Sequence, residues 1–530
     1  MISMLYDDSM LGFHFVLTPE DARRTEQKAF DLGVPSLLLM EHAAIAVVDE
    51  LEKTLGGCSG RRVLFLCGTG NNGGDGLAAA RLFQMRGGFA EVWLSGGPKT
   101  PDANTQLKWA QALGIEITNL REACGDDFPL EYCDTPKKCY DAYVDAVLGT
   151  GFRGVPDEIT ERMIMAPRHD REIPIKGEKP VIAVDIPSGI DGKTGNTPGA
   201  FMYADVTVTF NAPKPGLYLT QEREAVGKIV IADIGLWHMM PWNSDALLLD
   251  EPELKCEMLT PKALRLMEKR QLNAHKGDCG RVLIYAGKEG MAGAAAMCAK
   301  AAVTAGAGLV TVACEKEILP ILQTLVPNAM CMEIAQAVKR SPAYDVFAVG
   351  CGLGQEETIW QNILALWNPE KKSVWDADAL NLLAKHGMKL GSNAVMTPHP
   401  GEAARLLNKP TEEILSDRIH AARELAQRYG CTAVLKSDVS VLCSIEEEGP
   451  AFMLNTVGTP ALAKGGSGDA LTGILSALLP YDLPLYSAAT ACLWHGLAGL
   501  SGEKKYGQRE LTTDQLISCL WDAERNAVTE

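Results

Sequence analysis

The residues best suited to chemistry lie in two glycine-rich segments, and the first reads GTGNNGGDG over residues 68–76. It separates an apolar run from a helical pattern. Its five glycines permit positive φ angles and a close backbone approach, and the helix start that follows presents free N–H groups to an anion. It contains the G-x-G-x-x-G spacing, but the next apolar run ends at WLSGG (residues 93–97) without the acidic residue that would bind a ribose. The segment predicts an anion-binding loop, with a purely structural turn as the alternative.

The second segment reads KGGSGDA over residues 464–470 and opens another helical pattern. Glycines at a helix start form an anion hole, and Asp469 in the first turn can reach a hydroxyl group that lies against it. The backbone donors would neutralise a moving phosphate while the carboxylate accepts the hydroxyl proton, so the segment predicts phosphoryl transfer with Asp469 as the base. The alternative is an aspartate that complements the helix dipole. The chain has no G-x-x-x-x-G-K-[ST] loop, so it does not hold a nucleotide in the P-loop manner.

Three polar residues at further strand ends can face the first segment, because open α/β sheets bind ligands beyond the carboxyl ends of their strands. Asp145 follows one apolar run, and Asp185 and Ser188 follow another. Together with Asn72, Asp145 and Ser188 supply hard oxygen ligands suited to an alkali or alkaline-earth cation. A cap or turn role is the alternative for both of them. Asp185 ends a strongly apolar strand, a costly place for a carboxylate, which favours a catalytic or ligand role.

The second half of the chain also contains four segments or residues that could contact a ligand, although none of them is specific when it is taken alone. GCGLG (350–354) can pass close to a ligand, and GMAGAA (290–295) allows close approach or tight helix packing. His399 stands between two prolines at a strand end, although a lone histidine in a turn is more often structural. Lys436 can contact a phosphate, although a surface lysine is the default.

Apolar runs that alternate with helical patterns must position these residues. Continuous apolar strands of this kind predict largely parallel sheets that are covered on both faces. A less regular segment that contains three prolines separates two such series. We therefore expect an α/β domain over residues 1–240, a connection over 241–275 and a second α/β domain over 276–530.

Composition narrows the class of protein. The 530 residues include 50 Lys and Arg against 67 Asp and Glu, a net charge of −17, and 47% are hydrophobic, which rules out a disordered chain. The acidic balance argues against nucleic-acid and membrane partners. Fifteen scattered cysteines without a C-x-x-C pair favour reduced thiols and a cytoplasmic location. The most apolar stretch, 292–312, predicts a packed helix that runs into a strand.

These motifs resemble a known family. GTGNNGGDG, DAVLGTGFRG and DIPSG are similar to the NAD(P)H-hydrate epimerase domain, and GAGLV, GCGLG, TPHPGE, VLKSDVS and GGSGDALTG to the ADP/ATP-dependent NAD(P)H-hydrate dehydratase. The fused order resembles the bifunctional NAD(P)H-hydrate repair enzymes. The resemblance implies a Rossmann-like three-layer domain followed by a ribokinase-like α/β domain.

The resemblance also implies an activity, the repair of NADH or NADPH that has added water across a ring double bond. The first domain would interconvert the R and S epimers. The second would dehydrate the S form by phosphorylating the hydroxyl group with ADP or ATP and eliminating phosphate. Potassium is implied for the first domain and Mg²⁺ with the nucleotide for the second. Assembly into a homo-oligomer is also implied.

Residue roles follow from the same resemblance. Asp185 and Asp469 would be catalytic, and Asn72, Asp145 and Ser188 would bind potassium. The epimerase site would comprise Asn71, Asn72, Gly73, Gly74, Asp75, Gly149, Thr150, Gly151, Phe152, Arg153, Gly154, Val155 and Asp185. The dehydratase site would comprise Ala294, Gly354, His399 and Asp469 for the hydrate, and Lys436, Ser437, Asp438, Val439, Ser440 and Gly468 for the nucleotide.

Two departures from the family pattern flank the nucleotide site. TPALA (459–463) stands where TPGMA is common, and Ser437 stands where a glycine often follows the lysine. We expect both differences to affect the choice between ADP and ATP as the phosphoryl donor more than the reaction itself. Two other readings stay open: a ribokinase-like small-molecule kinase with an N-terminal ligand-binding domain, and a protein whose first domain only binds.

Overall fold

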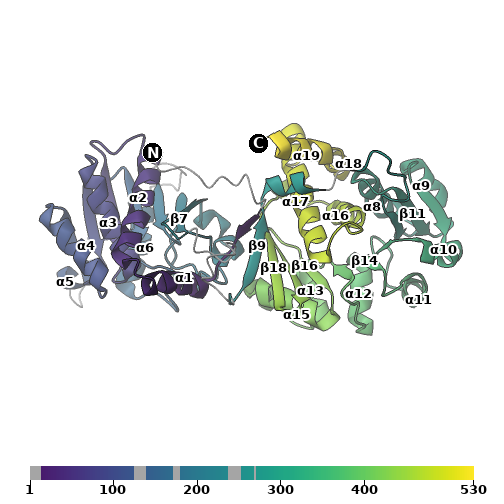
Figure 1. Cartoon of the computed structure of the whole chain (residues 1–530), viewed down its shortest axis with the longest axis horizontal. Helices are drawn as coiled ribbons and strands as arrows, with labels where there is room; N and C mark the ends of the chain where they lie inside the picture. The colour runs from purple at the N-terminus through teal and green to yellow at the C-terminus, as the bar shows by residue number, and fades with distance from the viewer. Residues whose placement is uncertain (1–12, 125–138, 171–178, 237–251, 268–269, 530) are drawn as a thin grey trace. The chain divides into compact units, whose positions relative to one another are not determined.

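The computed structural model describes residues 13–124, 139–170, 179–236, 252–267 and 270–529. The chain divides into two compact units, shown in Figure 1. The N-terminal unit comprises Phe15–Leu254, and the C-terminal unit comprises Lys255–Glu530 together with Met1–His14. The division falls within the segment 241–275. Each unit is built around one sheet of its own.

The N-terminal unit contains a seven-stranded sheet in the order β4-β3-β2-β5-β6-β7-β8, and all its neighbouring strands are parallel. From the central pair β2 and β5, the chain proceeds outward in opposite directions. The order therefore reverses between these two strands, which opens a crevice at their carboxyl ends. The strands are β2 (Arg62–Cys67), β3 (Phe89–Leu94), β4 (Glu116–Asn119), β5 (Ala142–Ala146), β6 (Val181–Val184), β7 (Val206–Phe210) and β8 (Lys228–Ala232).

Alternate residues of these strands build two cores, which makes three layers. In β2, Val63 and Phe65 pack with α2, α3 and α4, whereas Leu64 and Leu66 pack on the opposite face with α6. All four side chains are fully buried. The apolar run was expected to be covered on both faces, and it is. The helices are α1 (Pro19–Asp31), α2 (Ser36–Leu55), α3 (Asn71–Met85), α4 (Pro101–Ala112), α5 (Leu120–Cys124), α6 (Glu158–Asp170) and α7 (Pro215–Leu219).

The C-terminal unit contains an eleven-stranded sheet in the order β1-β9-β18-β17-β16-β15-β14-β13-β10-β11-β12. Its strands from β12 to β16 are parallel, whereas β16, β17 and β18 form an antiparallel meander. The order reverses between β10 and β13. The strands are β1 (Phe13–Phe15), β9 (Lys255–Leu259), β10 (Arg281–Tyr285), β11 (Leu309–Cys314), β12 (Met330–Glu333), β13 (Val346–Val349), β14 (Lys372–Trp375), β15 (Ala394–Met396), β16 (Thr432–Leu435), β17 (Ser440–Glu446) and β18 (Gly449–Asn455).

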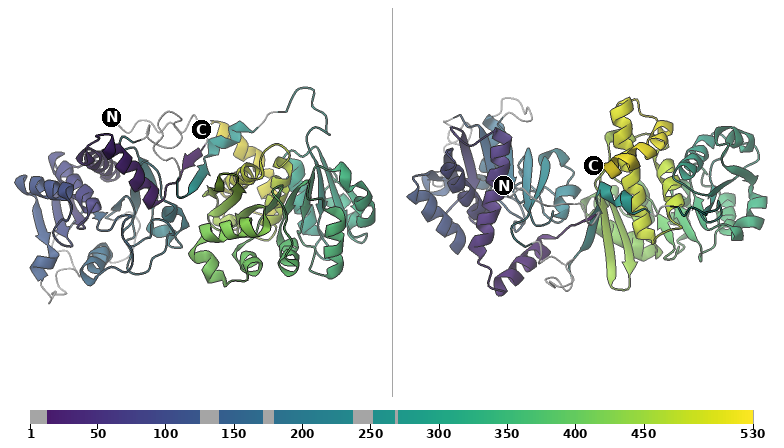
Figure 2. Two further views of the ribbon diagram at one scale, coloured as in Figure 1. Left: turned by 60° about the horizontal axis from the view of Figure 1, so that its bottom comes forward. Right: turned by 45° about the horizontal axis from the view of Figure 1, so that its top comes forward.

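Helices cover both faces of this sheet, as the two further views in Figure 2 show. Helices α8 and α16 pack closely because Gly473 of α16 faces the backbone carbonyl of Cys298 in α8, where a Cβ atom would lie 2.2 Å from the oxygen. The helices are α8 (Ala292–Thr304), α9 (Leu319–Leu325), α10 (Ile334–Arg340), α11 (Glu357–Leu366), α12 (Ala377–His386), α13 (Pro400–Leu407), α14 (Thr411–Ser416), α15 (Arg418–Tyr429), α16 (Ser467–Leu478), α17 (Pro484–Tyr506), α18 (Thr513–Ser518) and α19 (Leu520–Thr529).

The apolar stretch 292–312 forms α8 followed by β11, as the sequence predicts. Among the helices that the structure describes, none is long and apolar enough to span a bilayer. The cysteines whose side chains the structure describes are free thiols, in line with the expectation of reduced cysteines.

Candidate active sites

A cavity of about 900 Å³ lies at the carboxyl ends of β2 and β5, where the strand order reverses. The loop after β2, the loop after β5, the end of β6 and helix α1 all contribute to its lining. Of the residues that the sequence predicts for the epimerase site, the lining includes Asn71, Asn72, Asp75, Gly149, Thr150, Gly151, Phe152 and Asp185. Gly73, Gly74, Arg153, Gly154 and Val155 are not among the described lining residues.

The glycines of the loop after β2 serve close packing rather than unusual φ angles. No glycine between residues 68 and 76 has a positive φ angle, so that expectation was wrong. A Cβ atom on Gly68 would lie 1.9 Å from the carbonyl oxygen of Val147, and one on Gly73 would lie 2.0 Å from that of Gly68. A Cβ atom on Gly74 would lie 2.6 Å from Cε of Met40. Gly73 therefore lets α3 begin close to the end of β2, and Gly74 lets it pack against α2, so that the N-terminus of α3 faces the cavity.

Asp185 faces the cavity from the end of β6 and is held in a strained conformation, with a φ angle of 66°. Its Oδ1 atom lies 2.5 Å from Nζ of Lys214 and 3.0 Å from Oγ1 of Thr209. Only 3% of the Lys214 side chain is exposed, and Nζ also donates to Thr209 and to the carbonyl of Phe210. Lys214 was not predicted from the sequence. A lysine between two prolines, four residues after the apolar strand β7, was the available signal.

Further carboxyl groups surround Asp185. Burial raises the pKa of Glu26 to about 6, with Lys214 opposing the rise and Asp185 adding to it. Burial also raises the pKa of Asp75 well above its usual range, and Asp185, Glu26 and Asp102 add to that rise. The sequence analysis predicted Asp75 but missed Glu26, because a glutamate in an N-terminal helix carries no motif.

Asp145 and Ser188 lie together beneath the loop that follows β5. Asp145 is fully buried, and its carboxylate accepts from the Ser188 hydroxyl at 2.6 Å and from the Ser188 backbone N–H at 2.8 Å. Burial raises its pKa to about 6, and the hydrogen bonds from Ser188 and Val147 oppose the rise. The Asn72 side chain abuts Gly149 in the same loop, and its buried Nδ2 atom has no hydrogen-bond partner among the residues that the structure describes.

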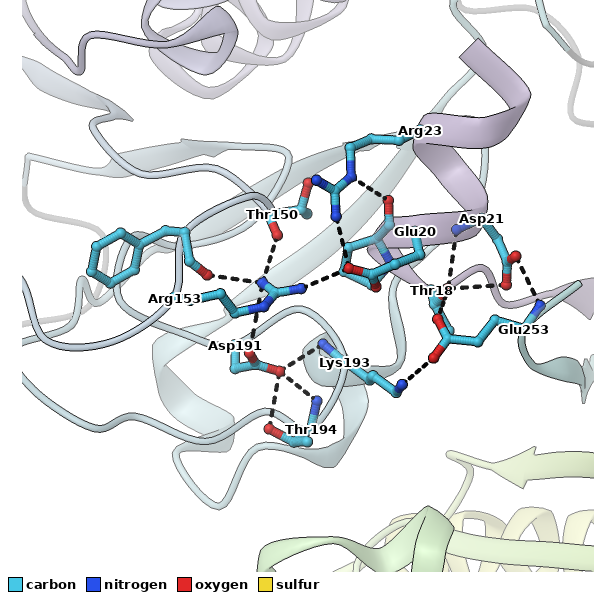
Figure 3. A network of polar contacts seen from close by, with 12 residues as sticks. Thr18, Glu20, Asp21, Arg23, Thr150, Arg153, Asp191, Lys193, Thr194 and Glu253 are labelled. Carbon is cyan, nitrogen blue, oxygen red and sulfur yellow. Dashed lines mark hydrogen bonds and ion pairs between the residues drawn. The ribbon is translucent and has the colours of Figure 1, made fainter. Parts of the chain in front are cut away.

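The loop 149–155 is fastened to helix α1, as Figure 3 shows. The Arg153 guanidinium donates to the carbonyls of Thr150 and Phe152 and lies 3.0 Å from Oε1 of Glu20. Val155 is 67% exposed. Arg153 therefore organises the loop and its contact with α1.

The second site surrounds the start of α16. Gly466 has a φ angle of 91°, which glycine adopts without strain, and it caps the helix. Asp469 lies in the first turn, as predicted. Burial raises its pKa to about 6, with a hydrogen bond from the Cys351 thiol opposing the rise and Asp376 adding to it. A carboxyl group that titrates near neutral pH is suited to accept a proton.

A buried cluster at the ends of β14 and β16 adjoins this helix start. Nζ of Lys436 lies 2.7 Å from Oδ1 of Asp376, and Thr472 donates to Oδ2 at 2.9 Å. A Cβ atom on Gly468 would lie 3.6 Å from Nζ of Lys436 and 3.7 Å from Oδ2 of Asp376. The structure thus brings Lys436, Gly468 and Asp469 together, and it adds Asp376, which the sequence analysis missed.

The other predicted residues lie on neighbouring loops. A Cβ atom on Gly352 would lie 2.9 Å from Cβ of Ala294, so the glycine-rich loop 350–354 meets the start of α8. His399 caps α13 by accepting from the Gly401 N–H at 3.0 Å, and its ring is exposed. Burial raises the pKa of Glu402, beside it, to about 7, with Lys436 opposing the rise.

The loop between β16 and β17 carries the predicted nucleotide residues 436–440. The Asp438 carboxylate accepts from Ser437 at 2.9 Å and from Arg418 at 2.7 Å. Val439 and Ser440 are buried. The Asp438 carboxylate therefore binds other side chains of the protein. The Lys436 ammonium, in contrast, lies next to the helix start that carries Asp469.

Comparison with known proteins finds one family match in each of the two units. Residues 36–216 match the family described as YjeF-related protein N-terminus, and residues 282–521 match the family described as NAD(P)H-hydrate dehydratase. The bifunctional NAD(P)H-hydrate repair enzyme Nnr of Escherichia coli (strain K12) is 36% identical over 539 residues, which cover 98% of this chain and 95% of that protein. The protein of the same name from Moorella thermoacetica is 33% identical over 519 residues, which cover 94% of each.

A solved structure is also similar. The ADP/ATP-dependent NAD(P)H-hydrate dehydratase from Bacillus subtilis, co-crystallized with ATP/Mg2+, is 27% identical with a TM-score of 0.45, covering 51% of this chain and 97% of that chain. The expected fold class, a Rossmann-like three-layer domain followed by a ribokinase-like α/β domain, is confirmed. The chain belongs to the family of bifunctional NAD(P)H-hydrate repair enzymes.

Proposed function

We propose that this chain repairs hydrated NADH and NADPH with two activities. The N-terminal unit interconverts the R and S epimers, and the C-terminal unit dehydrates the S form at the expense of ADP or ATP. The observation that carries the proposal is the position of Asp469 in the first turn of α16, with Gly468 and the Lys436 ammonium beside it. A base, an anion hole and a partly buried cation meet at one point there.

This arrangement accounts for the dehydration. Hydroxide is a poor leaving group, whereas phosphate is a good one. Asp469 accepts the proton of the substrate hydroxyl group as its oxygen attacks the terminal phosphoryl group of the nucleotide. The backbone N–H groups at the start of α16, together with Lys436, stabilise the charge on the transferring group. Elimination of phosphate and loss of a ring proton then restore the double bond.

In the N-terminal unit, the cavity binds the hydrated dinucleotide. The N-terminus of α3 and the loop after β5 provide backbone N–H groups for its phosphates. Asp185 contacts the hydrated ring. Lys214 and Thr209 fix the orientation of that carboxylate, which acts as a proton acceptor.

Asn72, Asp145 and Ser188 fit a potassium ion by their chemistry. A fully buried carboxylate and a hydroxyl group supply hard oxygen atoms side by side, and the Asn72 amide abuts Gly149 of the loop that follows β5. A cation bound there would supply positive charge beneath the loop that begins at Gly149. Mg²⁺ would enter the C-terminal site with the nucleotide, whose phosphate charge it neutralises.

We further propose that the protein works in the cytoplasm as a homo-oligomer. Light scattering of the purified chain tests the assembly, and a monomer at micromolar concentration would contradict it.

A recovery assay tests the function. Purified protein is incubated with hydrated NADH and Mg²⁺ and with ADP or ATP in turn, and absorbance of the reduced nicotinamide is followed. We expect full recovery from both epimers and release of one inorganic phosphate per molecule repaired. Recovery with neither donor would contradict dehydration. A stable phosphorylated product would instead identify a small-molecule kinase.

A further inference from the structure

We propose that Glu26 is a second catalytic carboxyl group of the N-terminal site and that it works with Asp185 as an acid–base pair during epimerisation. The inference rests on the proposed function of that unit. It assigns a role to a residue of helix α1, outside the glycine-rich and strand-end motifs.

The position of Glu26 follows from the face of α1 that the cavity exposes. Arg23, Glu26 and Phe30 all line the cavity, and their spacing of three and four residues places them on one face of the helix. Asp185 lines the same cavity from the end of β6. A bound ring therefore meets carboxyl groups that come from two different elements of the unit.

Hydrogen bonds and an ion pair hold helix α1 against the rest of the unit, and they therefore fix the backbone position from which the Glu26 side chain extends. Thr18 caps the helix by accepting from the Asp21 N–H, and the fully buried Asp21 carboxylate accepts from the backbone N–H of Glu253 at 2.9 Å. Glu20 pairs with Arg153 of the loop 149–155. Figure 3 shows these contacts around the first turns of α1. Such anchoring is what a catalytic side chain on a helix requires.

The two carboxyl groups have different surroundings. Asp185 is bound by Lys214, Thr209 and the Phe210 N–H. In the part of the chain that the structure describes, the Glu26 carboxyl has no hydrogen bond or ion pair. The charged groups that act on it are Lys214, Asp185 and Arg23, with Asp75 close by on α3. Burial raises the pKa of Glu26 to about 6, so it is available as an acid near neutral pH.

The chemistry of the hydrate calls for such a pair. Water adds to an enamine double bond with its oxygen on the carbon that is bonded to nitrogen. To invert that carbon, the nitrogen lone pair forms a C=N⁺ bond while the C–O bond breaks, and Glu26 protonates the oxygen, which leaves as water. A water molecule then adds to the opposite face. Its electron pair forms the new C–O bond, the C=N⁺ π bond breaks and returns its electron pair to nitrogen, and Asp185 takes the proton of the water. Proton exchange with solvent then returns Glu26 to its protonated state and Asp185 to its ionised state. For the opposite epimer, Asp185 acts as the acid and Glu26 as the base.

The test measures epimerisation alone in the full chain. R-form hydrated NADH, purified by chromatography, is incubated without nucleotide, and the S form is quantified across pH 5–9, with the spontaneous rate subtracted. We expect Glu26→Gln to lower kcat at least about 100-fold with little change in KM. The wild-type rate should fall as the pH rises through about 6, where Glu26 loses its proton, and the variant should lose that fall. Glu26→Asp should retain a large part of the rate.

Asp31→Asn is the matched control, because Asp31 lies on the same helix, is exposed and does not line the cavity. Its kcat should equal that of the wild type. A Glu26→Gln variant with wild-type kcat, or with only a raised KM, would overturn the catalytic role. If Asp75→Asn removed the alkaline fall and Glu26→Gln kept it, the acid would be Asp75 and the proposal would be wrong. A wild-type chain that forms no S epimer would instead overturn the epimerase function itself.

Discussion

The Lys436 ammonium and the Asp376 carboxylate form an ion pair at 2.7 Å that joins the end of β16 to the end of β14. Thr472 of α16 donates to the second oxygen of the same carboxylate. Only 2% of the Asp376 side chain is exposed. One buried carboxylate therefore ties two strand ends to the helix that carries Asp469, and it sets the position of the lysine next to Gly468.

Replacing Asp376 should damage both stability and dehydration. The Asp376→Asn variant leaves the Lys436 charge in a buried position without its counter-ion, which we expect to cost about 3 kcal/mol of unfolding free energy. Urea unfolding and the recovery assay measure the two effects. The control is Asp514→Asn, which removes the exposed ion pair with Lys300 and should change stability by less than about 1 kcal/mol. Equal stability of the two variants would contradict the role given to Asp376.

The dehydration rate should follow the ionisation of Asp469. Because the pKa of this carboxyl is about 6 and the base must be ionised, the rate should rise with pH through about 6 and then level off. Asp469→Asn should lower kcat about 100-fold or more. Single-turnover recovery of absorbance with saturating nucleotide measures both. A pH-independent rate in the wild type would exclude Asp469 as the base.

The same substitution should not reduce stability above pH 6. The pKa of Asp469 rises from its ordinary value of 3.8 on folding, so the folded state binds more protons than the unfolded state between these values. The carboxylate therefore costs stability as the pH rises through this window. An asparagine carries no charge and avoids that cost. Thermal unfolding at pH 8 should show a midpoint for Asp469→Asn equal to or above that of the wild type, and a lower midpoint would contradict the argument.

Two glycines of one loop should differ sharply in their tolerance of alanine. A Cβ atom on Gly68 would lie 1.9 Å from the carbonyl oxygen of Val147, whereas one on Gly70 would meet nothing within 4 Å. We expect Gly68→Ala to cost about 3 kcal/mol because the backbone must shift, and Gly70→Ala to leave stability nearly unchanged. Denaturant unfolding of both variants compares them. Equal costs would show that close packing does not constrain this loop.

Potassium should stabilise the N-terminal unit. A cation that binds only the folded state raises the unfolding temperature with concentration. We expect thermal unfolding in potassium chloride to exceed that in N-methylglucamine chloride, and the difference to vanish in Asp145→Asn. The epimerisation rate should follow the same pattern. A potassium effect that persists in Asp145→Asn would place the ion elsewhere.

The sequence predicts most of the architecture because continuous apolar runs and glycine-rich strand ends have direct structural causes. Asp185 and Asp469 could be singled out because a carboxylate beside an apolar strand, or in a helix start, is unusual. Glu26 could not, because it becomes notable only when distant segments meet around it, which local spacing does not encode. Lys214 and Asp376 follow apolar strands, but neither stands in a glycine-rich motif, so this signal alone did not single them out.

The roles of individual loop residues were also beyond local reasoning. For Gly68 and Gly73 the sequence allowed positive φ angles and a close backbone approach, and the structure shows only the close approach. Arg153 stays a predicted substrate-binding residue, and the structure adds that its guanidinium donates to Glu20 and to two carbonyl groups. A motif identifies a segment, and the packing around it decides which side chain faces the ligand.

The strand order of the larger sheet has a practical consequence for dissecting the chain. Strand β9 lies between β18 and β1, and β1 consists of Phe13–Phe15, which come before every helix and strand of the N-terminal unit. A fragment that starts at Lys255 would lack β1 and would leave one side of β9 without a neighbour. An edge strand with unpaired backbone N–H and C=O groups can pair with the same strand of another molecule. Truncated dehydratase preparations should therefore be more prone to aggregate than the intact protein, unless the short leading strand is supplied by fusion.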